Sequence, residues 1–416
     1  MVPRPLAGPR IAFLECAVTM LWTSLISLIG GLIVLEMSAR WWIRFRRAYY
    51  VLPPGLRLRL HLDRDTFPEL EPVARFEVNA DGERGPEVPR TARGERLYRV
   101  LVAGGSQPEG YFLDQDASWP GVVHALLGQA RHLDTLGASN VHVGSIARSG
   151  IGAEALDLLL ARVLPRYARL DAIVILVGAS DVLRWLEEGA PSAAAGSSVP
   201  ISDVFRCHPE GRFGWAPKAL ALFELLARWR RRWLRPLQVH HRAGRWVRGA
   251  RAMRARARII RTTMPDPTAM IDHFDRHFRS IVRQAKAGAN RVIVVRQSWF
   301  AKDAYTPEEA AHMWHGGVGR AWCEDVTTFY SLDVTSRLMA QLDARAARIA
   351  SDLDVEQIDL MSLLEPSLGT YYDFFHLTPA GARTVASAVA ATLLGEKVGT
   401  GAFEQPQARR EGLRAS

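Results

Sequence analysis

Short apolar runs alternate with longer amphipathic stretches along most of the chain after residue 96. The runs are rich in β-branched residues and show no polar–apolar alternation, which is typical of strands buried on both faces of a parallel sheet. The longer stretches have the period of helices that cover such a sheet. The pattern therefore predicts an α/β fold with strands at Tyr98–Ala103, Val141–Gly144, Ala172–Val177 and Arg291–Val295, and with helices at Trp119–Ala130, Ala153–Leu164, Thr268–Ala287, Asp333–Asp352 and Pro379–Leu394.

A different pattern stands near the start of the chain. From Ile11 to Leu35 the sequence is almost uniformly apolar, and Glu15 is its only charged residue. A membrane span needs about 20 apolar residues, whereas the apolar core of a cleaved signal peptide has only about 7–15. Trp41 and Trp42 follow the run, where indole rings favour the membrane interface. We therefore expect an uncleaved N-terminal transmembrane helix.

The charges that flank this helix give little guidance on its orientation. Arg4, Arg10 and the amino terminus precede it, and four arginines follow it between Arg40 and Arg47. Because positive residues favour the cytoplasmic side, charge alone favours a cytoplasmic C-terminal domain by a margin of one.

An arginine-rich segment interrupts the α/β rhythm. Region 182–267 has no convincing strand pattern, and Arg228–Arg261 holds thirteen arginines and no acidic residue. The net charge of the whole chain is +10, so its basic character is local to this segment. The composition fits contact with anionic lipid or an acidic glycan, contact with nucleic acid, or a solvated helical insertion. No nucleic-acid motif accompanies the segment, so no nucleic-acid partner is expected.

Two short motifs carry the candidate chemistry. Ser106 follows the first predicted strand behind two glycines, at the sheet end where ligands of open α/β folds bind. Asp373 stands three residues before His376, just ahead of the helix predicted to begin at Pro379. In such a loop Asp373 can orient the imidazole while His376 takes the proton of a serine hydroxyl.

Taken together, these motifs resemble the SGNH/GDSL hydrolase superfamily, in a membrane-anchored branch whose first block reads G-G-S-x-x-E. The likeness extends from Phe76 to Leu394. Four blocks occur in the family's order, at Gly104–Glu109, Val143–Gly150, Gly178–Asp181 and Asp373–His376. Further stretches like this branch are Phe76–Asn79, Arg84–Gly85, Gln297–Trp299 and Met313–Gly317.

Two positions depart from the family's pattern. Ser145 stands where the second block has an asparagine, and Ser180 stands where the third block has one. The resemblance implies an oxyanion hole formed by the amides of Ser106 and Gly150 and, here, by the Ser180 hydroxyl. Loss of one such donor costs a factor on the order of 10²–10³ in rate. A slow or specialised enzyme fits these departures, and so does a domain that has lost turnover.

The resemblance implies a flavodoxin-like three-layer α/β/α fold with a central parallel sheet, preceded by one transmembrane helix. It implies a serine esterase or acyl-transfer enzyme acting on an O-acyl, above all O-acetyl, ester of a small molecule, lipid or cell-envelope glycan. Ser106 is then the nucleophile, with His376 as base and Asp373 orienting it, and no metal or cofactor takes part. The catalytic domain would lie outside the cytoplasm. The alternative function is that of a binding or scaffold subunit of an envelope complex.

Two other readings of the sequence compete with this one. Gly150-x-Gly152-x-x-Ala155 matches a dinucleotide-binding pattern, although several residues separate it from its strand. His312-x-x-His315 suggests a metal, although it lacks the H-E-x-x-H order. Three tryptophans are candidates for stacking on sugar rings, namely Trp299, Trp314 and Trp322.

The chain is therefore expected to have four parts. These are an anchor and juxtamembrane segment (1–50), a lead-in (51–95), a hydrolase-like domain with its arginine-rich insertion (96–395, insertion 182–267), and a disordered polar tail (396–416). With only three cysteines, none in a C-x-x-C pair, a disulfide scaffold and thiolate zinc are excluded.

Overall fold

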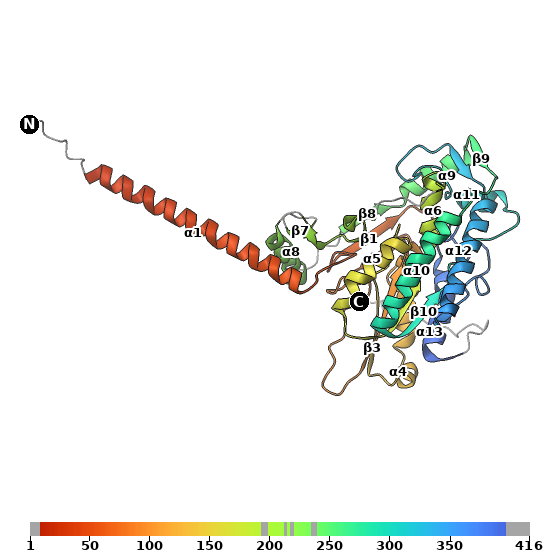
Figure 1. Ribbon diagram of the computed structural model, residues 1–416, viewed down its shortest axis with the longest axis horizontal. Coiled ribbons are helices and arrows are strands. Elements are labelled where there is room, and N and C mark those ends of the chain that lie inside the picture. The colour runs from red at the N-terminus through yellow and green to blue at the C-terminus, as the bar shows by residue number, and fades with distance from the viewer. Residues whose placement is uncertain (1–8, 193–198, 212–213, 217–219, 234–238, 397–416) are drawn as a thin grey trace, which may run out of the picture.

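The computed structural model describes residues 9–192, 199–211, 214–216, 220–233 and 239–396. The tail expected to be disordered lies outside these residues apart from residue 396. A long helix, α1 (Pro9–Phe45), projects from an α/β body (Figure 1). It contains the one described segment that is long and apolar enough to cross a membrane, Cys16–Phe45, with a mean hydropathy of 2.1 and no residue buried in its most apolar window.

Five parallel strands form the central sheet. In the order β12-β10-β5-β3-β4, they are β12 (Glu356–Ile358), β10 (Ala289–Val295), β5 (Leu170–Leu176), β3 (Leu97–Gly104) and β4 (Asn140–Ser145). Counted along the chain this is the order 2-1-3-4-5 of flavodoxin-like folds, so the predicted fold class is confirmed. The sequence pattern did not predict the edge strand β12. This strand is only three residues long, and two of its residues, Glu356 and Gln357, are polar and exposed.

Helices cover both faces of this sheet. Figure 1 shows α5 (Ala153–Val163), α10 (Thr268–Gly288) and α12 (Leu332–Asp352) side by side across one face. On the opposite face α13 (Pro379–Leu394) packs against α3 (Trp119–Leu127) and α4 (Ala130–Leu136). The helix predicted over Trp119–Ala130 ends earlier, at Leu127, where Gly128 caps it, and Ala130 begins α4. Shorter helices are α2 (Ser106–Glu109), α6 (Ala179–Glu187), α11 (Pro307–His312) and the 3₁₀ turn Leu164–Arg166.

A second, three-stranded sheet joins the lead-in to the insertion. β1 (Arg57–Leu62) pairs antiparallel with β2 (Val73–Glu77) and parallel with β8 (Val239–Ala243). The insertion, expected to be helical, therefore also contains a strand. β8 reads VHHRA, with four of its five residues exposed, so the hydrophobic pattern gave no sign of a strand that forms through pairing with β1.

The remaining elements of the insertion are also mixed. β9 (Ile259–Arg261) pairs with β11 (Thr328–Tyr330), which lies outside the insertion. The other elements of the insertion are α7 (Ile201–Val204), β6 (His208–Gly211), β7 (Gly214–Ala216), α8 (Ala221–Trp233) and α9 (Arg245–Ala255).

Several insertion arginines point into the protein. Arg248 forms an ion pair with Asp63 of the lead-in. Arg251 donates to the backbone carbonyl of Tyr372 at 2.8 Å, and Arg254 donates to that of Tyr330 at 3.0 Å. These three of the thirteen arginines thus bind other parts of the protein, which a count of charges does not reveal.

A buried carboxylate, Glu83, joins the lead-in to the central sheet. It accepts hydrogen bonds from His142 at 2.7 Å, from Arg99 at 2.9 Å and from Tyr167 at 2.6 Å. Burial alone would raise the pKa of Glu83, but the His142 hydrogen bond and the charge of Arg99 lower it to about 2. Gly144 leaves room for this carboxylate, since a Cβ there would lie 2.1 Å from Glu83 Oε2.

We expect Glu83→Gln to lower the free energy of unfolding by about 3 kcal/mol, because it removes the buried negative charge that Arg99, His142 and Tyr167 contact. The folded pKa of Glu83 lies below the ordinary 4.5, so its stabilisation is complete above pH 4.5 and is lost as the pH falls toward 2. The variant should lack this part of the acid dependence. Urea unfolding of the detergent-solubilised protein checks this, with the exposed Glu71→Gln as control; equal losses in both variants would contradict it.

Candidate active site

The structure brings Ser106, His376 and Asp373 into one chain of hydrogen bonds. Ser106 Oγ lies 2.8 Å from His376 Nε2, and His376 Nδ1 lies 2.7 Å from Asp373 Oδ2. Ser106 follows β3, whereas the other two residues lie in the loop between β12 and α13. These are the contacts that let a base take the serine proton while a carboxylate holds the imidazole in one tautomer.

Asp373 is buried and bound on both oxygens. Its Oδ1 accepts the amides of Phe375 at 3.1 Å and His376 at 2.8 Å, and its Oδ2 also accepts the indole N–H of Trp314 at 3.0 Å. Burial alone would raise the pKa of Asp373, but the charge on His376 and these hydrogen bonds hold it well below its usual range. The carboxylate is therefore ionised at neutral pH and can stabilise an imidazolium.

Two glycines place Ser106 at the sheet edge. A Cβ on Gly104 would lie 1.9 Å from the carbonyl oxygen of Leu176 on β5, so only glycine fits there. A Cβ on Gly105 would lie 3.2 Å from the carbonyl oxygen of Ile151 and 3.7 Å from Ser180 Oγ. The strand can thus remain paired up to its end while the chain turns into α2 at Ser106.

A network of amides and a hydroxyl fixes the loops that carry the triad. Gln107 donates to Ser298 Oγ at 3.0 Å and to the carbonyl of Phe375 at 2.7 Å. Gln297 donates to Gln107 Oε1 at 3.0 Å and accepts the amide of Ala179 at 3.4 Å. The loops after β3, β5, β10 and β12 are therefore joined by buried side chains. Sequence reasoning noted Gln297 and Ser298 only as part of a resemblance and assigned them no role.

The three candidate oxyanion donors line the same cavity as the triad: Ser106, Gly150 and Ser180. Gly150 adopts the left-handed region (φ +77°) that favours glycine. Among the described residues, neither the Ser106 amide nor the Gly150 amide donates a hydrogen bond. Both N–H groups remain available to a ligand. Ser145, where the family pattern has asparagine, accepts the amide of Ala147 at 3.3 Å and so still braces the turn after β4.

Buried charged residues, named in the sequence only as part of the resemblance and without a role, hold the Gly150 loop. Glu109 accepts the Ser149 amide at 2.8 Å and also its hydroxyl. Burial raises the pKa of Glu109. Arg84, from the lead-in, donates to the carbonyls of Gly110 at 2.9 Å and Leu113 at 2.7 Å. The lead-in thus supports the turn that follows the nucleophile.

Asp181 holds the end of the Gly150 loop, where α5 begins. Its carboxylate accepts the amide of Ala153, the first residue of α5, at 2.9 Å, and burial raises its pKa to about 6. It also lies 2.8 Å from where a Cβ of Gly152 would stand. Because this carboxylate covers the N-terminus of α5, a pyrophosphate has no place there, and the dinucleotide reading of Gly150–Ala155 is not supported.

The His312-x-x-His315 pattern does not form a metal site. His312 lies 3.3 Å from Glu69 and also contacts the carbonyl of Glu308. His315 stacks on Trp314, with ring centroids 3.6 Å apart, and neither of its ring nitrogens has a hydrogen-bond partner among the described residues. Burial lowers the pKa of His315 to about 3, so this imidazole is neutral.

A cavity of about 1400 Å³ opens over the triad. The insertion supplies much of its wall, including Trp246 of α9, and Trp322 stands exposed on its rim. Trp299, a candidate for sugar stacking, is instead buried and donates to Ser336 Oγ at 2.7 Å. Trp314 lines the cavity but is bound to Asp373, so Trp246 and Trp322 are the exposed indoles.

No protein-family model matches the chain, and no curated protein matches it. Solved structures that resemble it include a GDSL lipolytic protein and an acetylxylan esterase. Axe2, an acetylxylan esterase from Geobacillus stearothermophilus, is 12% identical, with 73% of this chain and 96% of that one covered and a TM-score of 0.37. A lipolytic protein of the G-D-S-L family from Veillonella parvula is 10% identical (71% and 96% covered, TM-score 0.37). LAE5, an alpha/beta hydrolase from the metagenome of Lake Arreo, Spain, is 11% identical (73% and 95%, TM-score 0.38).

We expect a fluorophosphonate probe to label the protein at Ser106, because the hydrogen bond to His376 activates its hydroxyl. Ser106→Ala should abolish labelling, and Asp373→Asn should slow it by a factor on the order of 10⁴ because the imidazole loses its tautomer. Mass spectrometry of the labelled peptide gives the position. Ser202→Ala, a serine of the same cavity without a histidine partner, is the control. Labelling that persists in Ser106→Ala would contradict the assignment.

Proposed function

We propose that this protein is a serine esterase or acyl-transfer enzyme. The observation that carries the proposal is the hydrogen-bonded chain Ser106–His376–Asp373 at the floor of an open cavity. Its residues come from segments about 270 positions apart. The unpaired amides of Ser106 and Gly150 on the same cavity supply the second requirement of acyl transfer, a place for a developing oxyanion.

In the proposed reaction His376 Nε2 takes the proton of Ser106 Oγ as the oxygen attacks the ester carbonyl. The tetrahedral intermediate collapses to an acyl-serine when the imidazolium returns its proton to the leaving alcohol. Water, or a second hydroxyl compound, then attacks the acyl-serine with His376 again as base, and Ser106 is regenerated. Asp373 stabilises the imidazolium in both halves and stays ionised.

The proposed substrate is a short O-acyl ester, above all an acetyl ester, on a polar carrier such as a glycan. Charged side chains line the outer cavity, among them Arg148, Arg184 and Glu187, and the indoles of Trp246 and Trp322 are exposed there. Polar groups that alternate with flat aromatic surfaces suit a polyhydroxylated carrier better than a long acyl chain.

Restoring the third oxyanion donor should raise turnover. We expect Ser106→Ala to abolish hydrolysis of short-chain aryl esters, and Ser180→Asn to increase it by up to a factor on the order of 10² by adding an amide N–H. Initial rates with the purified full-length protein check this, and Ser202→Ala serves as control. Equal rates for the wild type and Ser106→Ala would favour the alternative function, a non-catalytic scaffold subunit.

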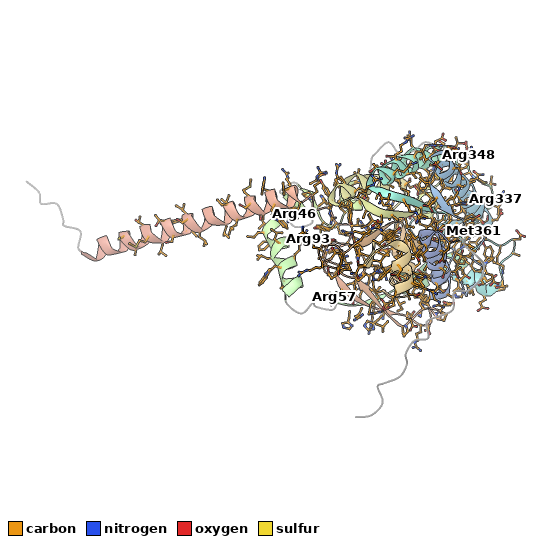
Figure 2. The ribbon with its side chains drawn as sticks, turned by 90° about the horizontal axis from the view of Figure 1, so that it is seen from below. Arg46, Arg57, Arg93, Arg337, Arg348 and Met361 are labelled. Carbon is orange, nitrogen blue, oxygen red and sulfur yellow. The ribbon has the colours of Figure 1, made fainter. Side chains whose placement is uncertain are left out.

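We also propose that the protein is attached to a membrane by α1 and α8 together. The Cys16–Phe45 segment, 30 residues at 1.5 Å each, is about 45 Å long, more than the roughly 30 Å of a hydrocarbon core. The last turns of α1 would therefore reach the headgroup region. At these turns α8 crosses α1 (Figure 2). Glu36 accepts the amides of Ala221 and Leu222, at 2.8 and 2.9 Å, and so caps the start of α8.

The outer face of α8 is suited to a bilayer surface. Phe223, Leu226 and Trp229 are each more than half exposed and recur every three residues, beside the exposed Arg230. Exposed apolar residues next to arginine are typical of interfacial helices. The membrane contact that the composition of Arg228–Arg261 allows is thus proposed for α8, because arginines of α9 bind inward. The catalytic domain is proposed to lie outside the cytoplasm, as the resemblance implies.

Spin labels should separate these two parts of the insertion. In nanodiscs with anionic lipid, we expect a label at Trp229→Cys to be accessible to oxygen and shielded from a water-soluble relaxation agent, because α8 lies at the interface. A label at Trp246→Cys on α9 should show the reverse. The native cysteines are replaced by serine beforehand. Equal exposure to water at both positions would contradict the docking of α8.

A further inference from the structure

A cluster of two imidazoles and a carboxylate lies at the edge of the cavity, outside the proposed catalytic machinery. His273 and His277 stand one turn apart on α10, so they share a helix face. Glu154 stands in the first turn of α5, which packs against α10. Each of the three offers one ligand atom, and these atoms all lie within 4.8 Å of one another. Glu154 and His273 also line the cavity.

The spacing within the cluster suits a tetrahedral ion. Glu154 Oε2 lies 3.3 Å from a ring nitrogen of His273, Nε2. Two ligands bound at about 2.1 Å in a tetrahedral zinc site are about 3.4 Å apart. Little movement is therefore needed for these two atoms to share one ion.

Neighbouring groups leave the required atoms free. Asp157, one turn after Glu154, lies 2.8 Å from His277 Nδ1. Its carboxylate accepts a hydrogen bond from the Nδ1–H group, so the lone pair of the His277 imidazole is on Nε2. No described residue forms a hydrogen bond with that nitrogen. Gln284 holds the other oxygen of Asp157. A carboxylate behind a ligating imidazole is the usual support of a zinc ligand.

The two oxygens of the Glu154 carboxylate also have different partners. Its Oε1 accepts the amide of Val199, in the insertion, at 3.0 Å, while Oε2 faces His273. One carboxylate can thus tie the insertion to α5 and still bind an ion. Two histidines and one carboxylate are a donor set that zinc favours, and a fourth position is left for solvent.

We propose that Glu154, His273 and His277 bind a zinc ion that links α5, α10 and the insertion at Val199. α5 begins three residues after Gly150, so the ion fixes the wall of the cavity beside a candidate oxyanion donor. The ion takes no part in the proposed acyl transfer. The proposal therefore goes beyond the proposed function and does not depend on it.

The test titrates metal-stripped, full-length protein in detergent with Zn²⁺ alone, by calorimetry, and then with Co²⁺, followed by visible absorption. The wild type should bind one zinc per chain at this site, and Co²⁺ should give the bands of a tetrahedral complex. His273→Ala and His277→Ala should each lose this binding. Asp157→Asn, which keeps all three ligands, should weaken it by about 10-fold or more. Zinc should raise the midpoint of thermal unfolding in the wild type but not in His273→Ala or His277→Ala.

The matched control removes another pair of imidazoles. His61 and His240 lie 2.8 Å apart on the exposed second sheet and offer zinc an alternative place. The double variant His61→Ala/His240→Ala should bind zinc as the wild type does. Absence of zinc binding in the wild type, or its loss in this control and not in His273→Ala, would overturn the proposal. Ester hydrolysis is measured separately, so failure of either proposal is recognisable by itself.

Discussion

The end of β3 approaches β5 so closely at Gly104 that no side chain fits between them, because a Cβ would lie 1.9 Å from the carbonyl oxygen of Leu176. Because glycine has no side chain, the strand stays paired at Gly104 while the chain turns into α2. This turn places Ser106 at the carboxyl edge of the sheet. The loops after β10 and β12 then bond to Gln107, the residue next to the serine, and Gln297 joins them to the loop after β5. A larger residue at position 104 would displace Ser106 relative to His376 and disturb every one of these contacts.

The fold class and the triad could be predicted because both leave local signals. Buried parallel strands are continuous apolar runs, and Ser106 follows one of them. Asp373 and His376 stand just before a helix whose start at Pro379 the sequence predicts. The supporting residues leave no local signal. Gln107 bonds to Ser298, 191 positions away, and the lead-in residue Arg84 bonds to carbonyls after the nucleophile. Only the folded chain brings such partners together.

The second sheet illustrates another limit of sequence patterns. A strand such as β8 is exposed on nearly every residue, so it buries no apolar face that could appear as alternation. It exists because β1 offers an unpaired edge, and the paired residues of β1 stand 181 positions earlier in the chain. The arginines of α9 show the same dependence on context. Counted along the chain they are a basic stretch, yet Arg251 and Arg254 bind backbone carbonyls beside the site.

The ladder between β1 and β8 also limits how the cavity wall can move. A cap joined to the body by loops alone can swing open on two hinges, whereas α9 follows directly on a strand that is hydrogen-bonded into a sheet. Between Phe45 at the end of α1 and Arg57 at the start of β1 the chain can extend at most about 40 Å. Under the proposed attachment of α1 to a bilayer, the cavity mouth would have a bounded height above it, and a large substrate would have to come within that reach.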